Sequence, residues 1–207
     1  MLNFILACLI SFLAGSFPSG FVIGKLVKGI DIRQHGSGNV GATNVFRVVG
    51  KRWGGLVLFL DALKGWLSVT VIASLFLSGE PSFSGLLWRL VAGFAAIAGH
   101  NWTPFLAFKG GKGVATSLGV ALGLFPKAAS CALASWALVL ALSGYVSLAS
   151  ILAAFSFPAW MFLFYRAAAG APILFGLSIL LALLILYTHR SNLGRLWAGK
   201  EHRIWKK

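Results

Sequence analysis

The sequence predicts an all-α membrane protein, a polytopic bundle of seven transmembrane helices. Hydrophobic residues make up 58% of its 207 residues and charged residues only 11%, with a mean hydropathy of +0.88. A soluble domain needs far more charge on its surface. The apolar residues also fall in runs that approach the roughly 20 residues needed to cross a membrane as a helix. These observations exclude a soluble enzyme, a disordered basic tail and a secreted disulfide scaffold.

The expected helices follow one another with short polar connections between them. The apolar runs lie at about 3–27, 54–77, 85–107, 114–125, 128–143, 146–165 and 171–188. The run at 114–125 is short for a crossing, so we expect it to be tilted or to unwind beside a site. No basic region precedes the first run, which we therefore interpret as a retained membrane helix and not a signal peptide. Without an internal repeat or a soluble insertion, residues 1–207 are predicted to form a single membrane-embedded domain.

The basic residues indicate how many spans there are and how they are oriented. With seven spans, only Arg89, Lys127 and Arg166 lie on the side opposite the C-terminal tail, and Lys64 lies within a span. All other lysines and arginines share the side of the tail, including Lys206 and Lys207. Because basic residues accumulate on the cytoplasmic side, the N-terminus is predicted to lie outside and the C-terminus in the cytoplasm. A six-span topology would export the basic tail, and we reject it.

The net charge of +14 points to anionic partners at the membrane. Cations at the ends of membrane helices attract lipid headgroups and small anions, so we expect membrane lipids as partners and no nucleic acid. Cys8 and Cys131 both lie inside apolar runs, where they are typical of core cysteines and fit neither a disulfide framework nor a metal site.

The first polar cluster, residues 35–47, has the composition of an anion-binding loop. Residues 36–41 match the pattern G-x-G-x-x-G, but a dinucleotide site needs a preceding strand, and a membrane helix precedes this loop. The glycines still allow backbone N–H groups to approach an anion closely. Further donors come from the side chains of Ser37, Asn39, Thr43, Asn44 and Arg47. The alternative is a loop that is merely flexible.

The second polar cluster, residues 99–116, contains Lys109-Gly-Gly-Lys112-Gly113. This is not a Walker A sequence, since the required spacing is missing. It does place two lysines and three glycines before the next helix, whose free N–H groups and dipole favour an anion. An ordinary basic loop is the alternative. His100 fits a binding role and an interface role equally well.

The third polar cluster, residues 187–195, follows the last span. His189 and Asn192 are three residues apart and would share one helical face. A lone histidine is more often structural, but the two anion-suited loops favour a functional role here. Asp61 and Lys64, inside the second run, predict either an ion pair that steadies the bundle or a supporting role at the site. Ser147 is a further candidate on the same side.

Several motifs are missing. No histidine is followed by aspartate at the spacing His-x4-Asp, which argues against acyltransferases that use this dyad, and no G-x-S-x-G sequence occurs. Only two carboxylates, Asp31 and Glu201, lie on the predicted cytoplasmic side, too few for a magnesium cage. We therefore expect neither a metal nor a cofactor.

On these residues the sequence resembles the bacterial acyl-phosphate-dependent glycerol-3-phosphate acyltransferase family. The matching stretches are Gly15-Ser16, Gly36 to Asn44 with Arg47, Asp61 to Gly65, Gly99-His100 with Pro104, Phe108 to Thr116, and His189 to Asn192 with Arg195. The resemblance implies a seven-helix enzyme of the bacterial cytoplasmic (inner) membrane with its active site facing the cytoplasm. It implies transfer of a fatty acyl group from acyl phosphate to glycerol 3-phosphate, giving lysophosphatidate and inorganic phosphate. Thr188 departs mildly from relatives, which often have a basic residue there.

Our mechanistic hypothesis is direct attack of the glycerol 3-phosphate hydroxyl on the acyl carbonyl. Four residues are predicted to be catalytic. Ser37 and Lys112 would stabilise the developing charge. His189 is the protein alternative to a phosphate oxygen as proton acceptor, and Asn192 is a positioning donor. The predicted substrate-binding residues are Gly38, Asn39, Gly41, Thr43, Asn44, Arg47, His100, Lys109, Gly110, Gly111, Gly113, Thr116, Ser147 and Arg195. The acyl chain would lie in a lateral groove among the helices.

The competing class is a transporter for an anionic solute. Transporters typically show inverted repeats and polar, broken helices near the middle of the membrane. Here no repeat occurs and the polar clusters gather on one side, which favours an enzyme. A purely structural membrane protein is the third possibility, but it would not need three anion-suited clusters.

Overall fold

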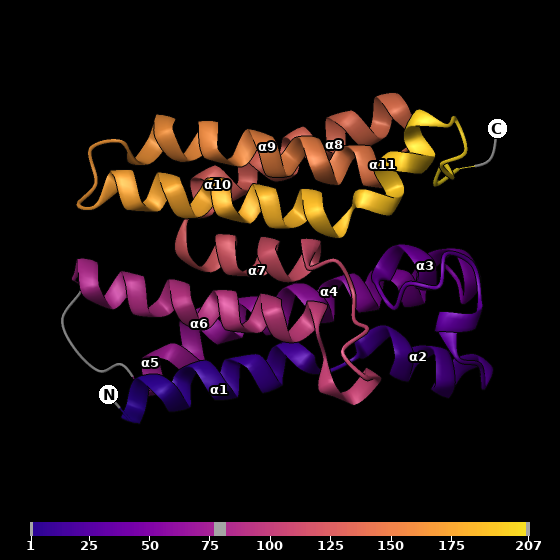
Figure 1. The fold of residues 1–207 in the computed structure, drawn as a ribbon, viewed down its shortest axis with the longest axis horizontal. Helices are drawn as coiled ribbons and strands as arrows, with labels where there is room; N and C mark the ends of the chain where they lie inside the picture. The colour runs from indigo at the N-terminus through magenta and orange to yellow at the C-terminus, as the bar shows by residue number, and fades with distance from the viewer. Residues whose placement is uncertain (1, 77–81, 206–207) are drawn as a thin grey trace. The chain divides into compact units, whose positions relative to one another are not determined.

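The computed structural model describes residues 2–76 and 82–205, and within these ranges every regular element is a helix. Most of the predicted connection 78–84, together with Lys206 and Lys207, lies outside the described residues. The chain forms two compact units, unit 1 (Met1–Leu124) and unit 2 (Phe125–Lys207), each with its own internal packing (Figure 1).

Unit 1 contains more and shorter helices than the apolar runs predict. Its elements are α1 (Leu2–Ser16), α2 (Ser19–Lys28), a 3₁₀ turn (Ile32–Gln34), α3 (Ala42–Val48), α4 (Lys51–Leu67), a π-helical turn (Ser68–Ile72), α5 (Ala73–Phe76), α6 (Phe83–Asn101), a second 3₁₀ turn (Pro104–Leu106) and α7 (Val114–Leu124). Helix α3 lies where the sequence indicated only a polar connection.

The first apolar run is broken at Phe17-Pro18, where a single helix over 3–27 was expected. Proline has no N–H and its ring clashes with the preceding turn, so α1 stops and α2 starts again at Ser19. The break leaves carbonyl groups without helical partners. Thr103 donates from Oγ1 to the carbonyl oxygen of Ser16 at 2.7 Å, and Lys64 donates from Nζ to that of Phe17 at 3.0 Å.

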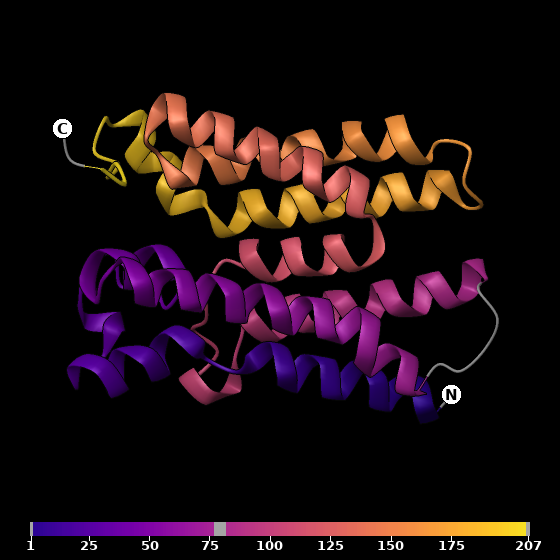
Figure 2. The same ribbon diagram turned by 180° about the vertical axis from the view of Figure 1, so that it is seen from behind.

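The helices of unit 1 approach one another closely at glycines. Helix α1 lies beside α6, and a Cβ on Gly15 would overlap the backbone carbonyl of Ala96 (Figure 1). Helix α4 lies beside α7, as seen from behind in Figure 2, and a Cβ on Gly119 would overlap the carbonyl of Ala62. Small residues at such crossings allow membrane helices to pack backbone against backbone.

Unit 2 consists of α8 (Pro126–Ser143), α9 (Val146–Tyr165), α10 (Ala171–Thr188) and α11 (Arg190–Trp197). Helix α9 packs against both α8 and α10. The tail after α11 returns to the turn between α8 and α9, because the amide of Ile204 donates to the carbonyl oxygen of Gly144 at 2.8 Å. This return places the tail beside the first turn of α9.

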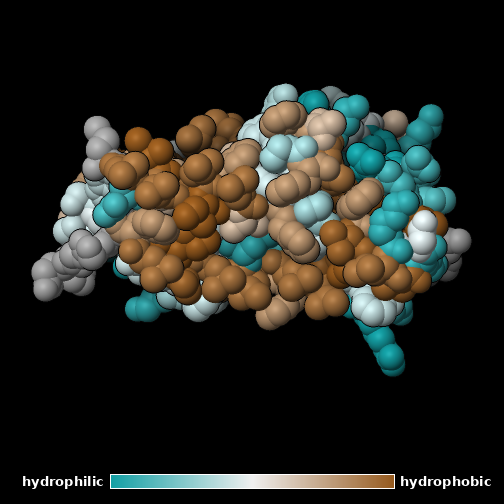
Figure 3. Space-filling view, turned by 90° about the horizontal axis from the view of Figure 1, so that it is seen from below, coloured by the Kyte–Doolittle hydropathy of each residue, from teal (hydrophilic) through white to brown (hydrophobic). Residues whose placement is uncertain are grey.

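Six stretches of the described chain are long and apolar enough to cross a membrane: Leu2–Lys28, Lys51–Phe76, Phe83–Leu106, Pro126–Ser143, Val146–Tyr165 and Ala171–Thr188. The remaining apolar helix, α7, has 11 residues and is therefore about 16 Å long. Figure 3 shows a face of the molecule that is largely apolar, with hydrophilic side chains gathered toward one end. Leu2, Ile5, Leu9 and Leu13 of α1 are among the exposed apolar side chains, as expected for a surface that meets lipid.

We expect Gly15→Ala to destabilise the protein. The added methyl group would overlap the backbone of α6, and overpacking of this kind typically costs about 1–3 kcal/mol. Thermal unfolding in detergent measures the effect as a lowered Tm. Gly55→Ala in α4 is the matched control, because a Cβ there meets no atom within 4 Å. Equal Tm values for the two variants would contradict the proposed close packing of α1 against α6.

Candidate functional site

Asn44 holds the first glycine-rich loop together. Its side chain is 2% exposed, and its Oδ1 accepts a hydrogen bond from the amide of Ser37 at 2.9 Å. Its Nδ2 donates to the carbonyl oxygens of His35 and Asn39, each at 2.9 Å. A Cβ on Gly36, where φ is +62°, would overlap the Asn44 amide. The contacts of Asn44 therefore support the loop, whereas the sequence indicated a direct substrate contact.

The outer surface of the same loop carries the predicted anion donors. Ser37 and Gly38 are exposed, and Thr43 and Arg47 are half-buried. The amide of Gly41 donates to Oδ1 of Asn39 at 2.9 Å just before α3 begins. The loop is thus an ordered turn that displays a hydroxyl and backbone groups, and not a loose linker.

The second loop, Lys109–Gly113, is fastened to the end of α6. The amide of Gly110 donates to the carbonyl oxygen of Asn101, and that of Gly111 donates to the carbonyl oxygen of His100, each at 3.0 Å. A Cβ on Gly111 would overlap Nε2 of His100, so only glycine fits against the ring.

The backbone around this loop is unusual. Ala107 and Phe108 directly before it have φ angles of 51° and 60°, a conformation that non-glycine residues rarely adopt. Such strain gathers at functional sites. Lys109 is exposed and Lys112 half-buried, so the two predicted lysines are differently placed. Thr116, in the first turn of α7, is fully buried against α4.

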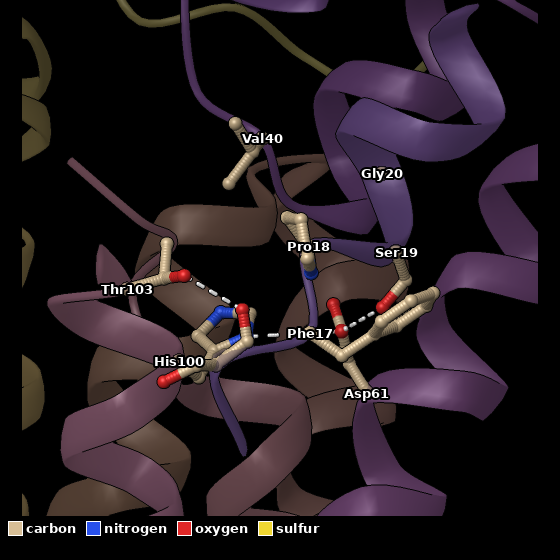
Figure 4. A pocket seen from close by; sticks show the side chains of 9 residues that line it. Phe17, Pro18, Ser19, Gly20, Val40, Asp61, His100 and Thr103 are labelled. Carbon is tan, nitrogen blue, oxygen red and sulfur yellow. Dashed lines mark hydrogen bonds and ion pairs between the residues drawn. The ribbon is translucent and has the colours of Figure 1, made fainter. Parts of the chain in front are cut away.

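A charged cluster of Asp61, Lys64 and His100 lies at the break between α1 and α2, where Figure 4 shows Asp61 and His100. Lys64 Nζ is 2.9 Å from Oδ1 of Asp61, which confirms the predicted ion pair. Ser19 donates from Oγ to the same oxygen at 2.7 Å, and His100 Nδ1 lies 3.7 Å from it. Asp61, Lys64 and His100 are each at most 8% exposed. The search for His-x4-Asp missed this pair because tertiary packing, and not spacing along the chain, brings His100 to Asp61.

A small hollow adjoins the cluster and is lined by Ser16, Phe17, Pro18, Ser19, Gly20, Val40, Asp61, His100 and Thr103 (Figure 4). The cavity volume open to a water molecule is about 10 Å³. That is room for about one water molecule. The hollow is therefore too small to bind a substrate.

In unit 2, Glu201 organises three predicted site residues. Its carboxylate accepts hydrogen bonds from Ser147 Oγ at 2.9 Å, Asn192 Nδ2 at 2.7 Å and Arg195 Nε at 2.7 Å. Burial by itself raises the pKa of this carboxyl, but the hydrogen bonds from Asn192, Arg195 and Ser147 together bring the pKa below its usual value. Sequence reasoning counted Glu201 only as a rare carboxylate and missed that it joins the tail to α9 and α11.

His189 lies between α10 and α11 and is 3% exposed. Its Nδ1 is 2.8 Å from the carbonyl oxygen of Ile185. Because a carbonyl oxygen can only accept, Nδ1 carries the hydrogen. In the neutral ring, Nε2 is then the nitrogen with a lone pair.

The predicted site residues therefore fall into ordered groups. Unit 1 holds the first loop and the second loop, and unit 2 holds the group around Glu201 together with His189. Within the described ranges, no group of three or more histidine, cysteine, aspartate or glutamate side chains could hold a metal ion.

The chain is similar to proteins of known family and to solved structures. The family model described as Glycerol-3-phosphate acyltransferase matches residues 5–199. A glycerol-3-phosphate acyltransferase of Desulforudis audaxviator is 48% identical over 94% of this chain and 92% of its own length, and one of Aquifex aeolicus is 44% identical over 94% and 95%. A crystal structure of PlsY, an integral membrane glycerol 3-phosphate acyltransferase, in its glycerol 3-phosphate form shares 40% identity with a TM-score of 0.85, covering 97% of this chain and 94% of that one. Its lysophosphatidic acid form matches with a TM-score of 0.82.

Glu201 gives the stability of the protein a pH dependence. Because its pKa is lower in the folded state, its contribution is complete above the unfolded value of about 4.3 and is lost as the pH falls through the folded value. We expect Glu201→Gln to lower the Tm at neutral pH and to make the decline of Tm toward acid shallower than in the parent. Thermal unfolding in detergent between neutral and acid pH measures both effects. Parallel curves for the two proteins would show that Glu201 does not stabilise through its charge.

Proposed function

The chain belongs to the glycerol-3-phosphate acyltransferase family and is an acyltransferase, and we propose that it takes its fatty acyl group from acyl phosphate. The acceptor is the hydroxyl of sn-glycerol 3-phosphate, and the products are 1-acylglycerol 3-phosphate (lysophosphatidate) and inorganic phosphate. The reaction would be the first acylation of phospholipid biosynthesis. Residues 1–207 would act as a single membrane-embedded domain.

The observation that carries this proposal is the pair of ordered glycine-rich loops in unit 1. The first displays Ser37 and the glycine backbone around it, held in place by Asn44. The second displays Lys109 and Lys112 from a backbone tied to α6. Both substrates carry a phosphate group, and backbone amides, hydroxyls and lysines are the groups that bind phosphate in proteins.

Acyl phosphate is a mixed anhydride and is already activated. The hydroxyl of glycerol 3-phosphate can therefore attack the acyl carbonyl directly, forming the ester bond while the bond from the carbonyl carbon to the phosphate oxygen breaks. Ser37, the loop amides and Lys112 would stabilise the charge on the carbonyl oxygen and the departing phosphate. Arg47 and Lys109 would bind the glycerol 3-phosphate headgroup.

The attacking hydroxyl must lose a proton. The two carboxylates on the predicted cytoplasmic side, Asp31 and Glu201, are poor acceptors because both are engaged. Glu201 accepts three hydrogen bonds, and the hydrogen bond from Arg33 to Asp31 lowers the pKa of that carboxyl to about 2. A phosphate oxygen can accept the proton, with Nε2 of His189 as the protein alternative. Asn192 would act as a positioning donor.

We also propose the arrangement in the membrane. Helix α7 would be a short seventh span, which puts the N-terminus outside and the C-terminus in the cytoplasm, in agreement with the distribution of basic residues. The enzyme would then lie in the bacterial inner membrane with its loops facing the cytoplasm, where glycerol 3-phosphate is dissolved. The acyl chain would lie among the helices, in a lateral groove open to lipid.

Purified protein in detergent, given long-chain acyl phosphate and labelled glycerol 3-phosphate, should release lysophosphatidate and inorganic phosphate in equal amounts. Acyl-CoA, offered as the sole donor in parallel, should give no product, because the loops are suited to a phosphate leaving group. Turnover with acyl-CoA alone would refute the proposed donor. No product from either donor in a folded preparation would favour the transporter alternative, which uptake of phosphorylated solutes into proteoliposomes would then test.

His189→Gln separates proton transfer from binding. If Nε2 of His189 is the essential base, turnover should fall by about 10²–10⁴-fold while binding of glycerol 3-phosphate, followed by calorimetry, stays close to that of the parent. His202→Gln, an exposed histidine of the tail, is the matched control. Appreciable turnover by His189→Gln would assign proton acceptance to the phosphate oxygen.

A further inference from the structure

We propose that Asp61 is a positioning residue for the second loop, Lys109–Gly113, and that it acts through the ring of His100. The inference rests on the proposed function, since it concerns how that loop is held in shape to bind phosphate. Neither residue needs to touch a substrate for this role.

Asp61, His100 and the second loop lie next to one another. Oδ1 of Asp61 is 3.7 Å from Nδ1 of His100, on one edge of the ring, which is a van der Waals contact and longer than a hydrogen bond. The opposite edge, at Nε2, lies so close to Gly111 that a Cβ would overlap it. The backbone of His100 also accepts the hydrogen bond from the amide of Gly111 at 3.0 Å. The ring therefore packs directly against the middle of the loop, and a shift of the ring toward Gly111 would displace it.

The carboxylate itself has little freedom to move. Ser19 Oγ, at 2.7 Å, and Lys64 Nζ, at 2.9 Å, both contact the same oxygen, and the residue is 2% exposed. Lys64 also donates to the carbonyl oxygen of Phe17 at the helix break. Asp61 is thus fixed from α2 and α4 while it faces a residue at the end of α6 (Figure 4).

Charge neutralisation of Lys64 alone does not explain this arrangement. A buried ammonium needs a counter-charge, but that need places no restriction on where His100 lies. The hollow beside the cluster has room for about one water molecule and not for a substrate, so Asp61 does not contact a substrate there. His100 is the group that reaches from the cluster to the loop.

The variant Asp61→Asn/Lys64→Met distinguishes the two roles because it removes both buried charges together. Under either role, Asp61→Asn alone should lower the Tm because it leaves the buried Lys64 without its counter-charge, and the double variant should recover part of that loss, short of the lost bond from Lys64 to the Phe17 carbonyl. If Asp61 only neutralises Lys64, the double variant should have the KM of the parent. If Asp61 positions His100, the KM for glycerol 3-phosphate would stay raised at least about fivefold in the double variant, with a much smaller change in kcat. Ser68→Ala is the matched control, since its buried hydroxyl donates to the carbonyl oxygen of Lys64 one turn away.

Adding His100→Gln completes the test, because two residues that act through one contact are not additive. The triple variant Asp61→Asn/Lys64→Met/His100→Gln should therefore have the same KM as the single variant His100→Gln. A KM of the double variant within twofold of the parent, or fully additive effects, would overturn the proposal. If the double variant cannot be purified, Asp61→Asn with and without His100→Gln gives the same comparison. An inactive parent would instead refute the proposed function, so the two failures are distinguishable.

Discussion

Lys64 donates to the carbonyl oxygen of Phe17 while its ammonium lies 2.9 Å from Asp61, and much of unit 1 depends on this contact. Pro18 ends α1 inside an apolar run, and the carbonyl groups freed there need hydrogen-bond partners. In a membrane such a break is tolerated only where other protein groups satisfy the backbone. The ammonium of Lys64 donates a hydrogen bond to the Phe17 carbonyl, and the carboxylate of Asp61 offsets the cost of burying the positive charge. The same carboxylate faces His100, whose backbone and ring meet the second loop.

Hydrogen bonds within the protein hold both loops of unit 1 in shape, without the anion that the loops are proposed to bind. Asn44 uses its amide group to bond the backbone of the first loop, and the end of α6 bonds the backbone of the second. Such preorganisation matters for electrostatic stabilisation, because donors that are already in place need no reorganisation during the reaction. In unit 2, Glu201 holds Ser147, Asn192 and Arg195 in the same way.

The sequence shows which polar residues the loops contain, but it does not show which of them support the loop and which are exposed on its surface. Asn44 and Ser37 look alike as donors in a glycine-rich stretch, yet one is buried and bonds backbone while the other is exposed. Thr116 is predicted from the sequence to bind substrate, but it is fully buried against α4 in the first turn of α7. Burial depends on neighbours that are distant along the chain, and spacing within one motif carries no information about them.

By itself, the sequence determined that the chain is helical and membrane-embedded, because long apolar runs with little charge have no other stable environment. It also offered the Asp61–Lys64 ion pair as one of two alternatives, since residues three apart share one face of a helix, and the structure shows the pair. Only the tertiary structure decided that His100 joins this pair and that Glu201 returns from the tail to bond Asn192 and Ser147. These contacts form between separate helices or across turns, and their geometry is set by how backbones pack at residues such as Gly15 and Gly119.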